Sequence, residues 1–330
     1  MSIKGLRKRG TDINFVGSLL IILIVLFVAI GIANNVFFNS NYIINITIRN
    51  VMEIGLLALP MTLLAISNCI DFSIGATMIL TIIAGGLVAD AYGSIAGILA
   101  AILVGASCGL LNGLIIIKLK LAPIVVTFAN MLLFVGIAEG ITSGASVRTY
   151  GFATFMGNTR IAGLPLAIVV YAALAAVFCV VLMKTTFGRC IYVIGRNENT
   201  ARYSGINVDR IKLALFVICG ICCAVAGFFY LGRFTSIRFN ADMALNLRVI
   251  TIIVLGGVSV SGGMGDMRGT VIATLIIGVL NSGLTVLNIP ISIQNIIHGS
   301  VLIISLTAYA FIIEKEKKRR IIHLKGSTIS

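Results

Sequence analysis

The residues that could do chemistry in this sequence are few, and their spacing fits no hydrolytic, redox or nucleotide-binding site. Cys219 and Cys222 form a C-x-x-C pair, but no second pair or histidine accompanies it, and it lies in an apolar run where thiols pack as small hydrophobic groups. The glycine-rich stretch 262–269 lacks the lysine of a phosphate-binding loop. The patterns H-E-x-x-H and G-x-S-x-G are absent. We therefore expect a protein that is not an enzyme, with no catalytic residue, no metal site and no cofactor of its own.

Five amide side chains remain as polar groups that a solute could meet along the apolar segments. Asn112, Asn130 and Asn281 lie within apolar runs, and Gln294 and Asn295 lie at the entry to the last run. Each amide can bind the hydroxyl group of a sugar on a translocation pathway, or it can hydrogen-bond to another helix. The sequence leaves both readings open.

Composition identifies the environment in which these groups are placed. Hydrophobic residues make up 59% of the chain and charged residues 11%, whereas soluble domains carry about 25% charged residues. The mean hydropathy is +1.11. We expect an all-α polytopic membrane protein, with residues 1–330 in a single transmembrane domain. The net charge of +14 lies between apolar runs, where it orients helices and gives no reason to expect nucleic acid as a partner.

About ten transmembrane helices are predicted from the apolar runs. They cover approximately residues 15–33, 52–67, 74–89, 95–117, 122–141, 164–183, 213–231, 248–260, 270–287 and 296–313. With the N-terminus inside, the inner segments carry 19 of the 25 Lys and Arg residues, and the outer segments carry the other six. Because short cytoplasmic loops are enriched in Lys and Arg, both termini are predicted to be cytoplasmic.

Two patterns of small residues indicate how the spans pack. Gly105, Gly109 and Gly113 lie four apart on one face of the fourth span, which allows another helix to approach closely. The tetrapeptide G-L-L-N that ends at Asn112 is echoed by G-V-L-N from Gly278 to Asn281, five spans later. An odd offset reverses the orientation, so the echo points to a possible inverted repeat, an arrangement common among transporters.

The distribution of charge bears on the energy source. No Lys or Arg lies at the centre of a predicted span, and all eleven acidic residues fall in loops or within about one turn of a span end. Proton-coupled carriers place ionisable groups in the membrane interior, so this chain is expected to borrow its energy from a separate protein. A self-sufficient secondary carrier or channel for a small polar solute remains the alternative, since sodium-coupled carriers and passive channels can lack such groups too.

The longest inner segment, Lys184–Lys212, is called the hook from here on. It carries six basic and two acidic residues. Asn199 can cap a first helical turn, and Gly205 can take the left-handed conformation that ends a helix, so we predict a short helix over about residues 200–204. A loop of this kind either only sets the topology or also binds a cytosolic motor, and the pattern alone does not decide between the two.

Three blocks of sequence carry a resemblance to a known family. The first reads S-N-C-I-D-F-S-I-G from Ser67 to Gly75. The second reads F-G-R-C-I-Y-V-I-G-R-N from Phe187 and A-R-Y-S-G-I from Ala201, and the third reads V-L-G-G-V-S-V-S-G-G-M-G-D-M-R-G-T from Val254. In this order and spacing the blocks resemble the permease subunits of bacterial ABC importers of the ribose type, over nearly the whole chain.

The resemblance implies a multi-pass protein of the bacterial cytoplasmic (inner) membrane that imports a sugar or sugar-like neutral solute. It implies three kinds of partner besides the lipid bilayer: a cytosolic ATP-binding subunit that binds the ATP, a second permease copy or paralogue, and an extracytoplasmic sugar-binding protein. The chain departs from the family pattern at Asn68 and over residues 244–250. These departures leave membership intact but leave the solute open.

Roles for particular residues follow from the resemblance and from local position. Contact with the ATP-binding subunit is expected from six residues of the hook: Arg196, Asn197, Glu198, Arg202, Tyr203 and Gly205. Asp71 and Ser73 are expected to cap the start of the third span, where a carboxylate suits the positive end of a helix. A structural role is also expected for five glycines of the motifs: Gly75, Gly256, Gly257, Gly262 and Gly263.

Overall fold

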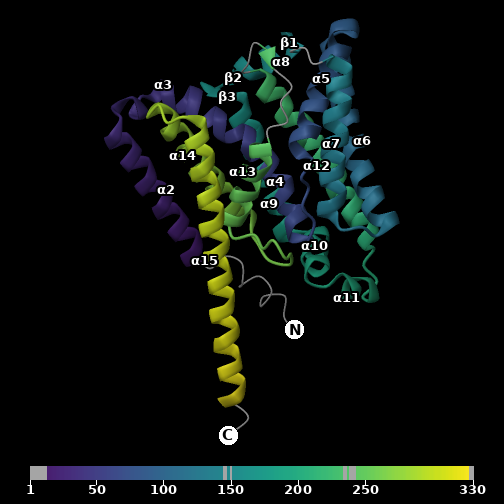
Figure 1. Cartoon of the computed structure of the whole chain (residues 1–330), viewed down its shortest axis with the longest axis vertical. Coiled ribbons are helices and arrows are strands. Elements are labelled where there is room, and N and C mark those ends of the chain that lie inside the picture. Colours follow the sequence, from purple (N-terminus) through teal and green to yellow (C-terminus); the bar gives the residue numbers. More distant parts are fainter. Residues whose placement is uncertain (1–12, 144–146, 149–150, 233–235, 238–242, 327–330) are drawn as a thin grey trace.

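The computed structural model describes residues 13–143, 147–148, 151–232, 236–237 and 243–326, and it is almost entirely helical (Figure 1). The longer helices are α2 (Ile13–Ala33), α4 (Ile48–Ile66), α5 (Ile74–Tyr92), α6 (Ser94–Leu119), α7 (Pro123–Thr142), α9 (Leu166–Lys184), α12 (Val208–Leu231), α13 (Met243–Leu255), α14 (Met267–Val286) and α15 (Ile291–Gly326). The shorter elements are η1 (Asn35–Phe38), α3 (Ser40–Tyr42), η2 (Ile43–Thr47), β1 (Val147–Arg148), α8 (Gly151–Asn158), β2 (Arg160–Ile161), β3 (Leu164–Pro165), α10 (Thr186–Arg196), α11 (Glu198–Tyr203) and β4 (Ser236–Ile237).

These helices confirm the predicted all-α membrane fold. Eight of the described helices are long and apolar enough to cross a membrane, and the two apolar segments Val51–Ile66 and Ala244–Leu255 are shorter. Together they occupy the ten predicted positions. The largest difference is at the last helix, which begins at Ile291 and continues to Gly326, well beyond the predicted end at residue 313.

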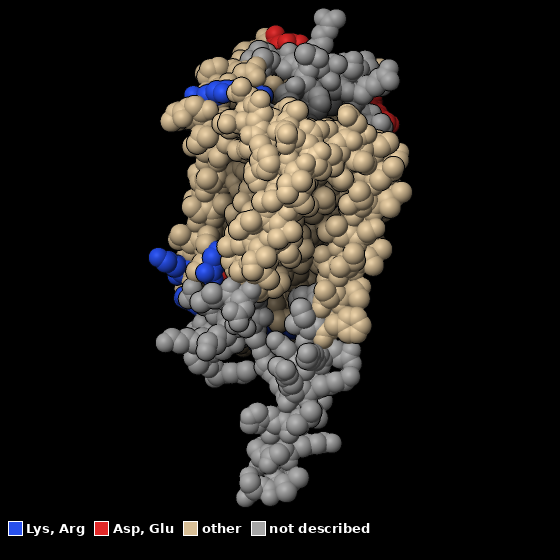
Figure 2. All heavy atoms as spheres, turned by 90° about the vertical axis from the view of Figure 1, so that its left-hand side faces the viewer, with Lys and Arg blue, Asp and Glu red and all other residues tan. Residues whose placement is uncertain are grey.

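The surface shows where the bilayer lies. Figure 2 shows a broad band without Lys, Arg, Asp or Glu on the face in view, with charged side chains above and below it. Charged groups avoid the hydrocarbon core because transfer out of water is costly, so the band marks the part of the molecule that faces lipid.

Two ends of the molecule can be told apart in Figure 1. One end, called the hook end, carries α10, α11 and the C-terminal part of α15. The far end carries α3, α8 and the small strands, and there β1 pairs with β4 through Val147 opposite Ile237 and Arg148 opposite Ser236. A main-chain pair therefore joins the segment after α7 to the segment after α12.

The core is built around α4, which is buried along its whole length from Val51 to Ile66. A helix that is apolar all round has to be covered on every side, and α4 packs on α9, α12, α13 and α14. The packing has a paired pattern. α6 packs on α12 as α14 packs on α4, α5 packs on α12 as α13 packs on α4, and α5 packs on α7 as α13 packs on α15. Exchanging α4–α7 with α12–α15 maps each of these three contacts onto its counterpart, the pattern expected of an inverted repeat.

Glycine allows the closest of these contacts. A Cβ atom on Gly105 or Gly109 of α6 would lie less than 3.0 Å from the backbone of Gly220 or Phe216 in α12. The predicted close approach of a second helix is therefore confirmed, and the second helix is α12.

Candidate functional site

The hook folds into two short helices, α10 and α11, where one was predicted. The side chain of Asn197 accepts a hydrogen bond from the backbone N–H of Thr200 at 3.0 Å and so caps α11. The prediction of Asn199 as the cap is wrong, because both asparagines can fill this position and only the path of the chain from α10 selects between them. Gly205 has φ +79°, the left-handed conformation expected after the helix end.

An ion cluster of four hook residues joins α11 to the first turns of α12. Arg202 contacts Glu198 at 2.9 Å and Asp209 at 3.2 Å, and Lys212 contacts Glu198 at 2.6 Å. The side chain of Lys212 is only 11% exposed. Burial acts to raise the pKa of Glu198, but hydrogen bonds from Lys212 and Arg202 outweigh it and hold the pKa below its ordinary value. Glu198 thus stays charged and offsets the buried ammonium group of Lys212.

The other predicted contact residues of the hook are open to solvent. Arg196, Asn197 and Gly205 are exposed, and Tyr203 is 93% exposed. An aromatic ring in water is an unusual use of a side chain that normally buries its surface. The hook therefore presents Tyr203 on its surface, while Glu198 and Arg202 already have partners within the chain.

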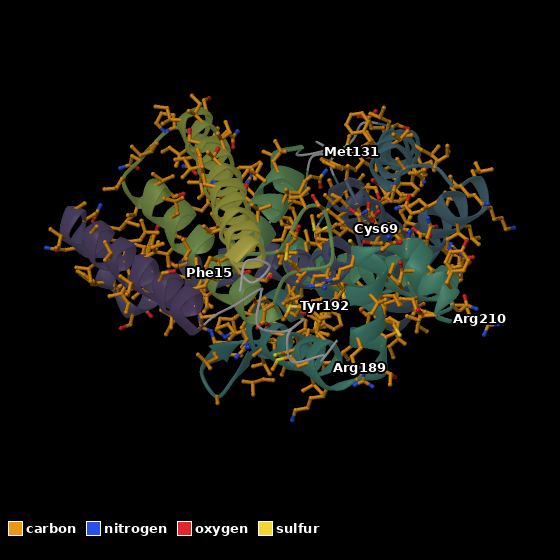
Figure 3. All side chains as sticks on the ribbon, turned by 90° about the horizontal axis from the view of Figure 1, so that it is seen from below. Phe15, Cys69, Met131, Arg189, Tyr192 and Arg210 are labelled. Carbon is orange, nitrogen blue, oxygen red and sulfur yellow. The ribbon has the colours of Figure 1, made fainter. Side chains whose placement is uncertain are left out.

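The hook is fastened to two inner turns of the bundle. Gly195 of α10 lies so close to both turns that a Cβ atom there would come within 3.0 Å of Ile66 O and Gly263 N. The backbone N–H of Gly263 donates to Ile66 O at 2.8 Å, and the hydroxyl of Tyr192 donates to Gly265 O at 2.7 Å. Seen from the hook end, Arg189 and Arg210 lie toward the edge of the molecule and Tyr192 lies further in (Figure 3). A Cβ atom on Gly262 would also lie within 3.0 Å of Asn68, so the three sequence blocks meet at one junction.

The glycines of the turn 256–265 are required by its shape. Gly257, Gly262 and Gly263 have φ between +73° and +81°, a range that other residues rarely adopt. Gly256 faces the backbone of Gly269 and Thr270 at the start of α14, with no room for a side chain. Asp266 caps α14 by accepting from the backbone N–H of Arg268.

A buried polar cluster lies between α4 and α5 and is called the inner cluster. Asp71 accepts hydrogen bonds from the backbone N–H of Ser73 at 2.8 Å and from its hydroxyl at 2.6 Å. Asn112 of α6 donates to Ser73 Oγ at 2.8 Å and accepts from Asn130 of α7 at 2.6 Å. The predicted cap is only partly right: Asp71 binds the N–H directly before α5, but Ser73 makes no side-chain cap and donates to Asp71 instead.

The depth of the inner cluster corrects the prediction that the interior holds no acidic group. Asn112 lies seven residues before the end of α6 and Asn130 seven residues after the start of α7, which places the cluster about 10 Å inside the helix ends. Asp71 is only 3% exposed. The sequence hid this because Asp71 occupies a break between two helices, and the break turns back into the bundle.

Gly75 is explained by a residue outside the predicted site. Asn246 of α13 accepts from the backbone N–H of Gly75 at 3.1 Å and donates to Phe72 O at 2.7 Å. Asn246 therefore caps α5 from another helix, and a Cβ atom on Gly75 would lie 3.0 Å from its oxygen. The departure from the family pattern over residues 244–250 was the only feature of the sequence that drew attention to Asn246.

The remaining amides lie toward the far end. Asn281 of α14 faces the buried His298 of α15, with 3.5 Å between Asn281 Oδ1 and His298 Nε2. The two residues are called the outer pair. Gln294 donates to Ile289 O at 2.9 Å, and Asn295 is exposed. The structure thus places Asn112 with Asn130 and Asn281 with His298, and it brings neither Gln294 nor Asn295 into a cluster.

Four functional candidates were missed by the reading of the sequence. The sequence treats Asp209 and Lys212 only as loop charges and Asn246 only as part of the departure over residues 244–250, and no role is predicted for His298. Their partners lie on other segments of the chain or in turns that the local pattern does not define. His298 carried the clearest signal, since ionisable residues within spans usually have a function.

Among the described residues, eight helices long enough to span a membrane and two shorter apolar helices surround buried polar clusters, with a structured basic hook at one end, which is the architecture of a multi-pass membrane protein. The chain belongs to the family described as branched-chain amino acid transport system / permease component, whose model matches residues 42–306. It is a protein of the bacterial cytoplasmic membrane.

Two relatives show how close the similarity is. The ribose import permease protein of Bacillus subtilis (strain 168) is 35% identical over 288 residues, which cover 86% of this chain and 89% of the relative. The autoinducer 2 import system permease protein of Escherichia coli (strain K12) is 34% identical over 291 residues, 86% of this chain and 88% of the relative. Both are named as import permeases and not as enzymes. No solved structure matches the chain.

Proposed function

We propose that this chain forms the translocation pathway of an ATP-driven importer for a sugar or another small neutral solute. The observation that carries the proposal is the junction at the hook end, where α10 binds both inner turns through Gly195 and Tyr192. A loop that only set topology would need charge but no fixed fold. The printed names of the relatives, an import permease for ribose and another for autoinducer 2, support the solute class.

The energy for import comes, in this proposal, from ATP bound to a separate cytosolic subunit, and the permease itself binds no cofactor. The other expected partners are a second permease copy or paralogue and an extracytoplasmic solute-binding protein. Residues 1–330 serve as one transmembrane domain, because the buried core around α4 draws on helices from both halves of the chain.

The ATP-binding subunit docks on the hook, and the hook residues divide into two groups. Arg196, Asn197, Tyr203 and Gly205 are exposed and available for contact. Glu198 and Arg202 act from within, because their charges are engaged in the ion cluster. With the cluster internally balanced, the hook keeps an excess of exposed basic residues, which favours a docking groove that carries carboxylates.

Reconstitution in liposomes tests the function. With the ATP-binding subunit and ATP in the lumen and the binding protein outside, labelled ribose or autoinducer 2 should accumulate, and leaving out any one component should stop uptake. Leucine is the matched control for solute class, since the family description names branched-chain amino acids. Uptake driven by an ion gradient alone would decide for the alternative, a self-sufficient carrier or channel.

A further inference from the structure

The outer pair is an incomplete version of the inner cluster. The two sites have a similar arrangement. In each, the side-chain oxygen of an asparagine, Asn112 of α6 or Asn281 of α14, faces a side-chain nitrogen of the following span, from Asn130 or His298 respectively. The packing pattern relates α6 to α14 and α7 to α15, so the two sites occupy equivalent positions at opposite ends of the repeat. Asn281 lies five residues from the end of α14, and His298 lies seven residues after the start of α15.

The inner cluster is closed by its own residues. The side-chain nitrogen of Asn112 donates to Ser73, its oxygen accepts from Asn130 at 2.6 Å, and Asp71 accepts from Ser73 twice. Asn112 also donates to Asp71 Oδ2 at 3.4 Å, so both of its N–H groups and one lone pair of its oxygen are used within the network, which holds the helices together. A structural role accounts for it.

The outer pair lacks a partner. His298 is 5% exposed, and its Nδ1 atom has no hydrogen-bond partner among the residues that the structure describes. The contact to Asn281 is long, at 3.5 Å. A buried polar atom without a partner is destabilising and calls for an explanation, such as a bound molecule.

The missing partner has a defined chemistry. If Nε2 donates to the oxygen of Asn281, then Nδ1 accepts and requires a donor, and a protonated ring would require an acceptor instead. A hydroxyl group serves in both roles. Access depends on α15, whose segment Ile291–Ala308 is the least buried of the eight long spans and which packs mainly on α13.

We propose that His298 and Asn281 form a subsite that binds a hydroxyl group of the transported solute in the membrane half opposite the hook. The inference rests on the proposed function, because it takes the solute to be a neutral polyhydroxylated molecule. It assigns the outer pair to the solute and the inner cluster to the scaffold.

The two histidines of the chain make a direct test possible. In the full-length permease in nanodiscs, labelled with ¹⁵N-histidine and carrying His323→Gln, the only histidine signals belong to His298. D-ribose at tens of millimolar should move these signals in a saturable way, and glycine betaine, which has no hydroxyl group, should not. Signals that stay unmoved, or that move equally with betaine, would overturn the subsite.

Transport assays can distinguish a failure of the proposed subsite from a failure of the proposed function on which it rests. His298→Ala should slow ATP-driven ribose uptake about tenfold, and its thermal midpoint should fall less than that of Asn130→Ala, because the contact that it loses, to Asn281, is long at 3.5 Å. Asn130→Ala is the control and should lower the thermal midpoint. If His298→Ala takes up ribose at the wild-type rate, the proposed subsite is wrong, while the proposed importer function is unaffected. A wild-type protein without ATP-driven uptake of any neutral solute would sink the importer, while the histidine signals would still report on hydroxyl binding.

Discussion

Glu198 is expected to contact the ATP-binding subunit, but its contacts within the chain indicate that it stabilises the hook. It lies on α11, the helix expected to meet the ATP-binding subunit, yet its carboxylate faces Lys212 at 2.6 Å and Arg202 at 2.9 Å. Exposed ion pairs contribute little to stability, but removing the counter-charge of Lys212, whose side chain is only 11% exposed, costs much more. Tyr203, one turn away and 93% exposed, has no such role in the fold.

The first prediction at this scale contrasts these two residues. Glu198→Gln should lower the free energy of unfolding at neutral pH by about 1–3 kcal/mol, since it leaves Lys212 without a carboxylate. Tyr203→Ala should leave the thermal midpoint unchanged and weaken assembly with the ATP-binding subunit. Thermal unfolding in detergent and co-purification measure the two effects. The division of roles is wrong if Tyr203→Ala unfolds the protein or Glu198→Gln leaves its midpoint untouched.

The same residue carries a pH dependence. The folded-state pKa of Glu198 lies below its ordinary value, so its contribution to stability is complete above the unfolded-state pKa of about 4.3 and is lost as the pH falls through the folded value. The unfolding midpoints of the wild type and Glu198→Gln should therefore differ at pH 7 and converge in strong acid.

At the scale of elements, the hook end behaves as one unit because three segments share a junction. α10 touches the end of α4 and the glycine-rich turn, and the turn leads directly into α14 through the cap at Asp266. Close backbone contact transmits displacement well, because tightly packed atoms cannot be compressed further. A push on the hook would therefore reach α4 and α14 together.

Gly195 tests this unit. Gly195→Ala should destabilise the fold by about 1–3 kcal/mol and reduce ATP-driven uptake, because the added methyl group overlaps Ile66 O and Gly263 N. Gly136→Ala in α7 is the matched control, with open space around its Cβ position, and should be neutral or stabilising by up to about 1 kcal/mol. Equal behaviour of the two variants would remove the junction from the mechanism.

At the scale of the whole molecule, α4 follows α3 at the far end and α12 follows α11 at the hook end, so the two helices that begin the paired sets run in opposite directions (Figure 1). The hook end and the far end are therefore built from similar parts in opposite orientation. The charge distribution predicts that the hook end is cytoplasmic, since basic loops stay inside.

Thiol labelling checks this orientation. Cys190 in α10 is half-buried, Cys179 is the other half-buried cysteine, and the rest are buried. In a Cys179→Ala background, a reagent that cannot cross membranes should label Cys190 in inside-out vesicles only. Tyr92→Cys, at a position 80% exposed at the end of α5, should react in right-side-out vesicles. The reverse pattern would contradict the orientation and with it the docking of a cytosolic subunit.

The sequence was most informative where structure is local. Hydropathy located the ten helices, and the left-handed Gly205 and the close packing at Gly109 follow from residue type and spacing. It failed where two candidates are locally equivalent, as with Asn197 and Asn199.

Depth and pairing across the chain could not be derived in the same way. Asp71 lies in a loop by every local criterion, and only the path of that loop back into the bundle buries it. Lys212 contacts Glu198, which lies 14 residues away in the sequence, and His298 contacts Asn281, which lies 17 residues away. Such pairs depend on how the connecting turns place the helices, which hydrophobic periodicity does not specify.

The length of α15 has a steric consequence for any cytosolic subunit. The helix has 36 residues, about 54 Å, and its last 18 residues follow the apolar segment that ends at Ala308. This last part of the helix projects past the hook end (Figure 1), and its length of about 27 Å is close to the thickness of the bilayer core. A body seated against α10 and α11 has this post beside it, so it must approach from the side or carry a recess that accommodates it. The post would thereby limit the angles from which such a subunit can approach the hook end.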